Sequence, residues 1–388
     1  MIFFNEKTRR VSLLTAVIAM SFGLFPKTAW AQQQQRQRRE KSVGIVENQE
    51  INLPDNLPPQ ILLSKAWASF DLRRIGDAHL YANAAWRRSG QNLPEANYLI
   101  GLVHYANADY TLAQRYFNRA LTEEPNPKSR VYFLYASAAI HVAEGKIDDY
   151  AAVMRSIMNE GLPPAQQELL KNQRQQALKI LFKSGLDRVL DLYRWPGRRD
   201  IFAAESLAML MYQRSVLKEE GRLPKPERPL FELDPEPLPG HVYDEKQPGS
   251  NIRSDMAESV ELLLYALDSQ VSTIINRMKY YRPDYAFTTL EKLFEDAKSY
   301  REIREYVMQG GLYRTYYLLA VAMYRYNPDD TQYKVLLNKL RLIPQAGEWA
   351  RRAQAQFDAP YIETYNLEST ELINISRGQA TDSLYTLF

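Results

Sequence analysis

The chain has 388 residues, of which 45% are apolar, 24% charged and 12% aromatic. These values describe a soluble globular protein of two or three domains, and they exclude a chain that is disordered throughout or an integral helical membrane protein. Cysteine is absent, which excludes disulfides, thiolate metal sites and thiol nucleophiles. The formal net charge is +3. Residues 1–31 carry all of it, so the rest of the chain is neutral and we expect no nucleic-acid partner.

Residues 1–31 have the pattern of a secretory signal peptide. A basic stretch precedes an apolar run from Val11 to Phe25, and Ala29-Trp30-Ala31 is the small-x-small pattern that signal peptidase accepts. The alternative, an uncleaved membrane anchor, is disfavoured because the run is shorter than the roughly 20 residues that cross a bilayer. We expect cleavage before Gln32 and a periplasmic or secreted mature protein.

A polar leader is predicted over residues 32–59. It begins with a tract of glutamine and arginine and contains Pro54, Pro58 and Pro59, a composition typical of flexible segments. Two roles fit this composition. One is a solvated spacer without a target, which we favour. The other is a cationic tail that touches anionic lipid or polymer, where each charge contributes about 1 kcal/mol.

Residues 60–220 repeat apolar side chains at intervals of three and four, with breaks at proline or glycine. This pattern predicts an all-α array of stacked antiparallel helical hairpins. In the best unit, residues 94–127, small, aromatic and proline residues stand at fixed spacings: Gly101, Ala113, Phe117, Ala120 and Pro125. The set resembles the tetratricopeptide repeat, in which small residues let paired helices pack closely. Neighbouring units match less well, and Asn97 and His104 occupy positions where the family has aromatic residues.

The resemblance implies a partner-binding surface on this unit. If Gly101 and Ala113 mark where the two helices touch, the opposite face of the first helix carries one stripe. The stripe consists of Tyr98, Leu102 and Tyr105. In the family such a stripe lines a concave groove that binds other proteins. The alternative is that neighbouring repeats bury all three side chains.

A basic segment lies near the end of the array. Residues 171–199 hold eight basic residues against Asp187 and Asp191, and a cluster of this kind can recognise an anionic polymer, lipid or acidic partner. The candidate anion-binding residues are Lys171, Arg174, Lys179, Lys183, Arg188, Arg194, Arg198 and Arg199. We favour the alternative, solvated helix faces, because these positions have mixed helical phases.

Residues 221–250 contain seven of the 21 prolines, a density that no helix tolerates. They are predicted to connect the array to a second helical domain over residues 251–360, either as a free linker or as a docked strap. That domain should begin with a helix over residues 254–282, whose apolar stripe follows a heptad pattern. A matching stripe over residues 287–303 predicts a long antiparallel hairpin.

Further helices are expected up to about Phe357. Gly310-Gly311 should precede one of them, and Asn327-Pro328-Asp329-Asp330 has the composition of a helix start. The tail over residues 361–388 shows no sustained periodicity. It is predicted to be partly ordered or to dock elsewhere as a peptide.

No motif for chemistry stands out. The histidines, His79, His104, His141 and His241, are scattered and form no metal-ligand pattern, so we expect no metal and no cofactor. His104 is expected to be an ordinary core residue. We predict a non-enzymatic scaffold of an envelope assembly, such as a flagellar motor structure, secretion system or wall-building complex, with other envelope proteins as partners. The alternatives are an enzyme that acts on envelope polysaccharide, with carboxylates brought together only by folding, and the anionic-polymer or lipid binder above.

Overall fold

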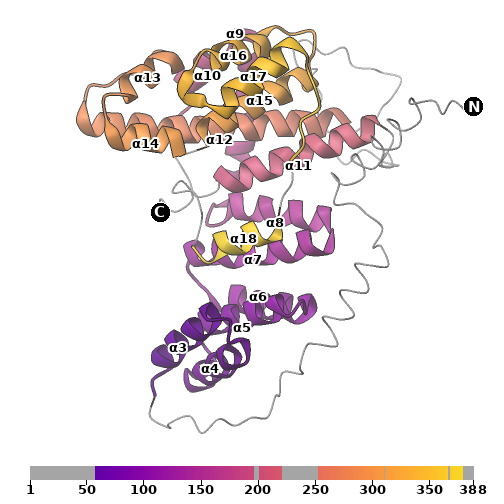
Figure 1. Cartoon of the computed structure of the whole chain (residues 1–388), viewed down its shortest axis with the longest axis vertical. Helices are drawn as coiled ribbons and strands as arrows, with labels where there is room; N and C mark the ends of the chain where they lie inside the picture. The colour runs from indigo at the N-terminus through magenta and orange to yellow at the C-terminus, as the bar shows by residue number, and fades with distance from the viewer. Residues whose placement is uncertain (1–56, 196–200, 221–251, 310, 366–367, 379–388) are drawn as a thin grey trace, which may run out of the picture. The chain divides into compact units, whose positions relative to one another are not determined.

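The computed structural model describes residues 57–195, 201–220, 252–309, 311–365 and 368–378 (Figure 1). Within these ranges the chain forms helices and no strand, so the predicted all-α class is confirmed. Contacts divide the chain into two compact units. Unit 1 contains the described residues up to Val153 together with those from 368 to Arg377, and unit 2 contains the described residues from Met154 to Tyr365.

Unit 1 consists of short helices joined by tight turns. Three of them start with proline at the first helical position, where the missing amide hydrogen is not needed. Asp109 and Asn126 cap two of the starts by accepting backbone N–H groups. The helices are α3 (Pro59–Asp71), α4 (Ile75–Arg88), α5 (Pro94–Ala106), α6 (Tyr110–Glu123) and α7 (Pro127–Glu144), followed by α8 (Ile147–Asn159), which continues into unit 2.

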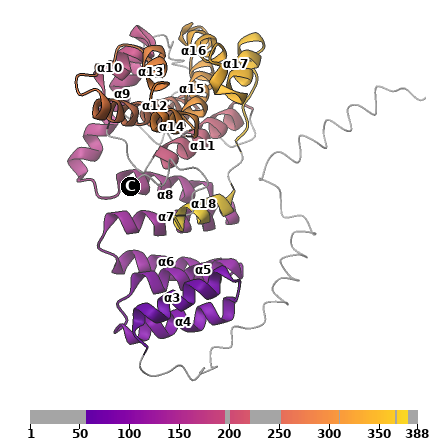
Figure 2. The same cartoon turned by 60° about the vertical axis from the view of Figure 1, so that its left-hand side comes forward.

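The helices of unit 1 pack against their neighbours in sequence. Helix α4 packs against α3 and α5, α6 packs against α5 and α7, and α5 also contacts both α3 and α7 (Figure 2). This arrangement is compatible with a helical repeat. The first helices of the hairpins, α3, α5 and α7, therefore lie next to one another.

Gly101 allows the two helices of the best unit to approach closely. A Cβ atom at this position would lie 2.4 Å from the ring of Phe117 in α6, and that ring is fully buried. Ala113 and Ala120 on the same helix are also fully buried. The predicted small and aromatic residues thus form the contact between α5 and α6.

Unit 2 is built around one long helix. Helix α12 (Ile252–Tyr281) packs against α11 (Ile201–Glu219), α15 (Leu312–Tyr326) and α9 (Pro164–Ser184). Its bounds agree with the predicted helix over residues 254–282, and every residue of the predicted stripe is fully buried. That stripe consists of Val260, Leu264, Leu267, Val271, Ile274 and Met278.

The remaining helices of unit 2 differ from the predictions in two places. The second arm is two short helices, α13 (Leu290–Ala297) and α14 (Arg301–Gln309), because the chain turns at Lys298–Tyr300. Asn327 ends α15 instead of starting a helix, since its amide N–H donates to the Met323 carbonyl. Helix α16 (Gln332–Arg341) begins five residues later. A 3₁₀ turn (Pro344–Ala346), α17 (Glu348–Asp358) and the earlier α10 (Leu186–Leu192) complete the unit.

The predicted proline-rich connector lies outside the described residues. The helices before and after it, α11 and α12, belong to the same unit and pack extensively against each other. Their contact includes a buried ionic network, in which Asp255 pairs with Arg214 at 2.5 Å and with Lys218 at 2.5 Å. The division between units falls near Val153, whereas proline density placed a domain boundary at 221–250.

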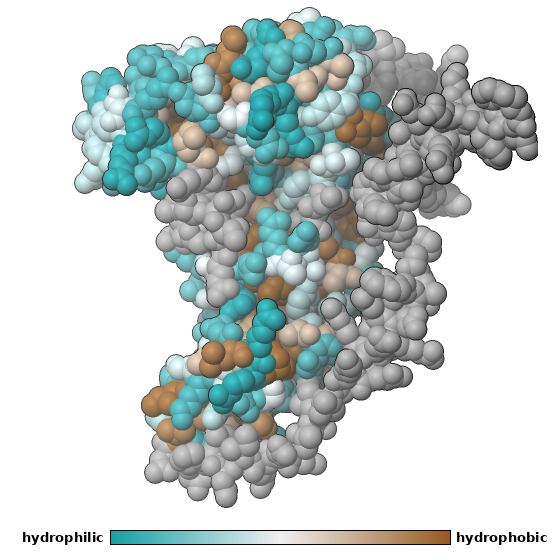
Figure 3. All heavy atoms as spheres, in the orientation of Figure 1, coloured by the Kyte–Doolittle hydropathy of each residue, from teal (hydrophilic) through white to brown (hydrophobic). Residues whose placement is uncertain are grey.

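The described helices carry no membrane-spanning segment: none of them combines the length and the apolar character that crossing a bilayer requires. The predicted signal peptide and leader lie outside the described residues, apart from residues 57–59. In the view of Figure 3 the described surface is mostly hydrophilic, and hydrophobic residues are visible over α3. That helix exposes Ile61, and Leu72 follows it.

Candidate partner-binding face

The last helix of the described residues lies on unit 1. Helix α18 (Ser369–Ser376) packs against α7, although the residues up to Tyr365 belong to unit 2 (Figures 1 and 2). Leu372 and Ile375 are its buried apolar side chains, and Ile373 packs against the core of unit 1. We call the side of unit 1 formed by α3, α5 and α7 the first-helix face.

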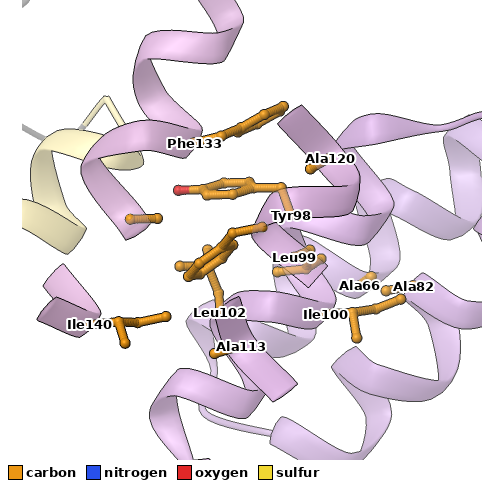
Figure 4. Close-up of a cluster of buried hydrophobic side chains, with 12 residues drawn as sticks. Ala66, Ala82, Tyr98, Leu99, Ile100, Leu102, Ala113, Ala120, Phe133 and Ile140 are labelled. Carbon is orange, nitrogen blue, oxygen red and sulfur yellow. The ribbon is translucent and has the colours of Figure 1, made fainter. Parts of the chain in front are cut away.

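Tyr98 of α5 lies at the centre of this face. Its ring stacks on Phe133 of α7 with centroids 4.8 Å apart, and it also contacts Phe117 and Trp67. In Figure 4 its hydroxyl points out of the apolar cluster toward α18. There the hydroxyl forms a hydrogen bond of 2.8 Å with the Ser376 hydroxyl. Burial raises the pKa of Tyr98, so the phenol stays protonated at physiological pH.

Tyr105 lies one turn beyond Leu102 on the same helix. It is partly buried, its ring contacts the ring of Tyr110, and the Ser369 side chain at the start of α18 lies near its hydroxyl. Burial raises the pKa of Tyr105, and the nearby Ser369 side chain opposes that shift. Tyr98 and Tyr105 of α5 thus lie near opposite ends of α18.

A positively charged residue, Arg377, follows the C-terminal end of α18. Arg377 forms an ion pair with Asp71, and its guanidinium lies over the rings of Phe70 at 5.2 Å and Trp67 at 6.0 Å. Only 16% of the Arg377 side chain is exposed. Aromatic rings and a carboxylate around one guanidinium form a specific recognition site for arginine. The segment from Ser369 to Arg377 therefore contacts α3, α5 and α7.

The structure brings the predicted stripe together but does not leave it open. Tyr98 and Leu102 are 4% and 1% exposed, and both belong to the core cluster of unit 1 (Figure 4). Tyr105 retains part of its surface at the edge of α18. The role of the three side chains in binding another protein stays a prediction.

The sequence gives little indication of α18. The only signal in the sequence is Leu372, Ile373 and Ile375, a spacing that suits one turn of amphipathic helix. Eight residues are too few for a convincing periodic pattern. The arginine that follows carries no sequence signal of its own, because its partners Asp71 and Trp67 lie about three hundred positions earlier in the chain.

The tail before α18 is fixed to unit 2. The Gln356 side chain forms hydrogen bonds with both the N–H and the C=O of Tyr361, as a neighbouring strand would. The buried carboxylate of Glu363 accepts from Tyr317 at 2.5 Å and pairs with Arg352 at 3.0 Å. The predicted docking peptide is therefore held in unit 2 up to Tyr365 and in unit 1 from Ser369.

Two of the scattered histidines meet in unit 1. His79 of α4 and His104 of α5 contact edge to face with ring centroids 5.6 Å apart, and His104 stacks on Tyr116. Both histidines are buried, as predicted for His104. Burial, together with the neighbouring His104, lowers the pKa of His79 to about 4. The part of the chain that the structure describes contains no group of three metal-ligating side chains.

Several basic residues of the 171–199 segment have partners within unit 2. Arg188 pairs with Asp191 at 2.8 Å, Arg174 lies over the ring of Tyr265, and Arg194 lies over the ring of Phe287. Lys171 and Lys183 are exposed, and Lys179 is partly buried. Arg198 and Arg199 lie outside the described residues. Binding of anions by this segment stays a prediction.

Comparisons with protein-family models, with curated proteins and with solved structures gave no match to this chain. The class of the protein therefore follows from its architecture alone. It is an all-α protein whose N-terminal unit stacks neighbouring helices in a manner compatible with a helical repeat.

Proposed function

We propose that the protein is a non-enzymatic scaffold of an extracytoplasmic envelope assembly, and that unit 1 binds a helical segment of another envelope protein on its first-helix face. The observation that carries this proposal is the docking of α18. A short helix, joined to unit 2 by sequence, already lies on this face, and together with Arg377, which follows it, contacts all three first helices. A surface that holds one short helix has the shape and chemistry to bind another.

The helices of unit 1 are proposed to be degenerate tetratricopeptide-like hairpins. The close approach at Gly101 and the buried Phe117 support this assignment. The two departures from the family pattern are accommodated by polar contacts. Asn97 is buried and donates to Glu123 at 2.6 Å, and His104 stacks on Tyr116. In that family the first helices supply the surface that binds other proteins, which agrees with the position of α18.

The proposed location rests on the sequence of residues 1–31. A basic stretch, an apolar run and a small-x-small cleavage pattern are typical of export by the general secretory route. An exported array of helices acts by bringing other components together. Flagellar motor structures, secretion systems and wall-building complexes all use such components.

The proposal is tested by site-specific photo-cross-linking in intact cells. A photoreactive amino acid replaces Tyr105, which lies at the edge of the first-helix face, or Arg115, an exposed residue of α6, as the matched control. We expect position 105 to cross-link to a discrete envelope protein and position 115 not to do so. Equal cross-linking at both positions, or no adduct at position 105 in the exported protein, would contradict the proposed function.

A further inference from the structure

The attachment of α18 to unit 1 is local and non-covalent. Its neighbours in sequence, up to Tyr365, belong to unit 2, so no chain connection within unit 1 holds it in place. The packing of α4 against α3 and α5, and of α6 against α5 and α7, does not involve α18. Unit 1 can therefore lose this helix and keep the contacts between its hairpins.

The helix itself has little intrinsic stability. It has eight residues, and an isolated helix of that length is not stable in water, so its formation depends on the face beneath it. Its apolar anchors are Leu372 and Ile375, three positions apart.

The polar contacts of α18 are specific. Ser376 meets the Tyr98 hydroxyl, and Arg377 enters the site formed by Trp67, Phe70 and Asp71. These anchors follow Ile375 directly in the sequence. The segment that occupies the face thus has a short pattern: an aliphatic residue, a second aliphatic residue three positions later, and then a hydroxyl residue and an arginine.

We propose that α18 is a built-in competitor of the first-helix face, and that the partner protein binds there with a short helix of this same pattern after displacing α18. The inference rests on the proposed function and adds the chemistry of the partner and the regulation of the site. Tethering gives α18 a high effective concentration, roughly millimolar, so only a helix with better anchors or a longer contact competes with it.

The test uses the full chain and a labelled peptide of residues 368–378, with binding measured by fluorescence anisotropy. Ile375→Asp in the chain places a charge in a buried site and should release α18. Thr370→Asp, at an exposed position of the same helix, is the matched control. We expect the Ile375→Asp chain to bind the peptide at least tenfold more tightly than the wild-type and Thr370→Asp chains do. Peptide carrying Arg377→Ala should bind the Ile375→Asp chain at least tenfold more weakly.

Hydrogen exchange of α5 and α6 verifies that the Ile375→Asp chain keeps unit 1 folded. If it does not, Arg377→Ala in the chain replaces it, because this change removes the final anchor without charging the core. Equal peptide affinity in the wild-type and opened chains would overturn the proposal. The proposal would also be overturned if the peptide bound equally well with and without Arg377. A wild-type dimer that Ile375→Asp abolishes would overturn it too, because the face would then be occupied by α18 of a second copy.

The two proposals fail separately. Cross-linking at position 105 that is equally strong in wild-type and Ile375→Asp cells would support the scaffold and refute competition by α18. Tight peptide binding to the opened chain without any cross-linked protein in cells would support the recognition chemistry and refute the scaffold.

Discussion

Gly101→Ala offers a direct test of the packing that defines unit 1. The added Cβ would lie 2.4 and 2.5 Å from two carbon atoms of the fully buried Phe117 ring, so the ring or the helix must move. Overpacking of this kind costs typically 1–3 kcal/mol, and the short distances favour the upper end, about 3 kcal/mol. The better helix propensity of alanine returns about 1 kcal/mol. We therefore expect a net loss of about 2 kcal/mol in the stability of unit 1.

Gly76→Ala is the matched control. Gly76 also lies in a helix, but a Cβ there would have no atom within 4 Å. Alanine at this position should stabilise the protein by about 0.5–1 kcal/mol through helix propensity alone. The assay is urea unfolding followed by circular dichroism, with hydrogen exchange of α5 and α6 assigning the change to unit 1. If Gly101→Ala were as stabilising as Gly76→Ala, the close contact with Phe117 would be refuted. In the Gly101→Ala variant, the second change Phe117→Leu should recover at least about 1 kcal/mol of the lost stability, because both changes affect the same contact.

Three further predictions concern pH, buried charge and processing. The pKa of His79 is lower in the folded protein than in the unfolded chain, so between about pH 6.5 and pH 4 the unfolded chain binds a proton that the folded protein does not. The contribution of His79 to the stability of unit 1 should therefore be complete above about pH 6.5. It should fall by at most about 3 kcal/mol as the pH falls to 4. The check is the urea midpoint of unfolding at both ends of this pH range, which should change less with pH in the His79→Gln variant than in the wild type. The same pH dependence in both proteins would refute the role of His79. Asp255→Ala should destabilise unit 2 by about 3–5 kcal/mol, because the buried Lys218 would lose the carboxylate with which it pairs. Chemical unfolding measures this loss, and a change below about 1 kcal/mol would contradict the prediction. The intact mass of the exported protein should lack residues 1–31, whereas a mass that retains them would refute cleavage before Gln32.

Features set by local sequence were predictable. The heptad stripe of α12 is buried as its spacing required, since residues three and four apart share one side of a helix. The breaks at Pro94 and Pro127 coincide with the starts of α5 and α7. These predictions succeed because periodicity and proline geometry act within a few residues.

Features set by tertiary context were not predictable. Asn327 has a sequence suited to starting a helix, yet the last turn of α15 extends far enough to use its amide. The positions of the predicted stripe on α5 follow from helical spacing, but Tyr98 is also a core residue because Phe133 and Trp67 approach it from other hairpins. The docking of α18 depends on residues about three hundred positions apart in the sequence, and no local pattern relates them.

The hydrogen bond between Tyr98 and Ser376 joins residues 278 positions apart. A ribosome adds roughly 5–20 residues per second, so the serine is synthesised roughly 15–55 s after the tyrosine that it meets. Helices α3 to α7 can fold within milliseconds, because their contacts are between neighbours in sequence. During each round of synthesis helices α3 to α7 are therefore available to fold long before α18 exists. Under the proposed competition, a partner that reaches helices α3 to α7 in this interval would meet no competitor, whereas a later partner would have to displace α18.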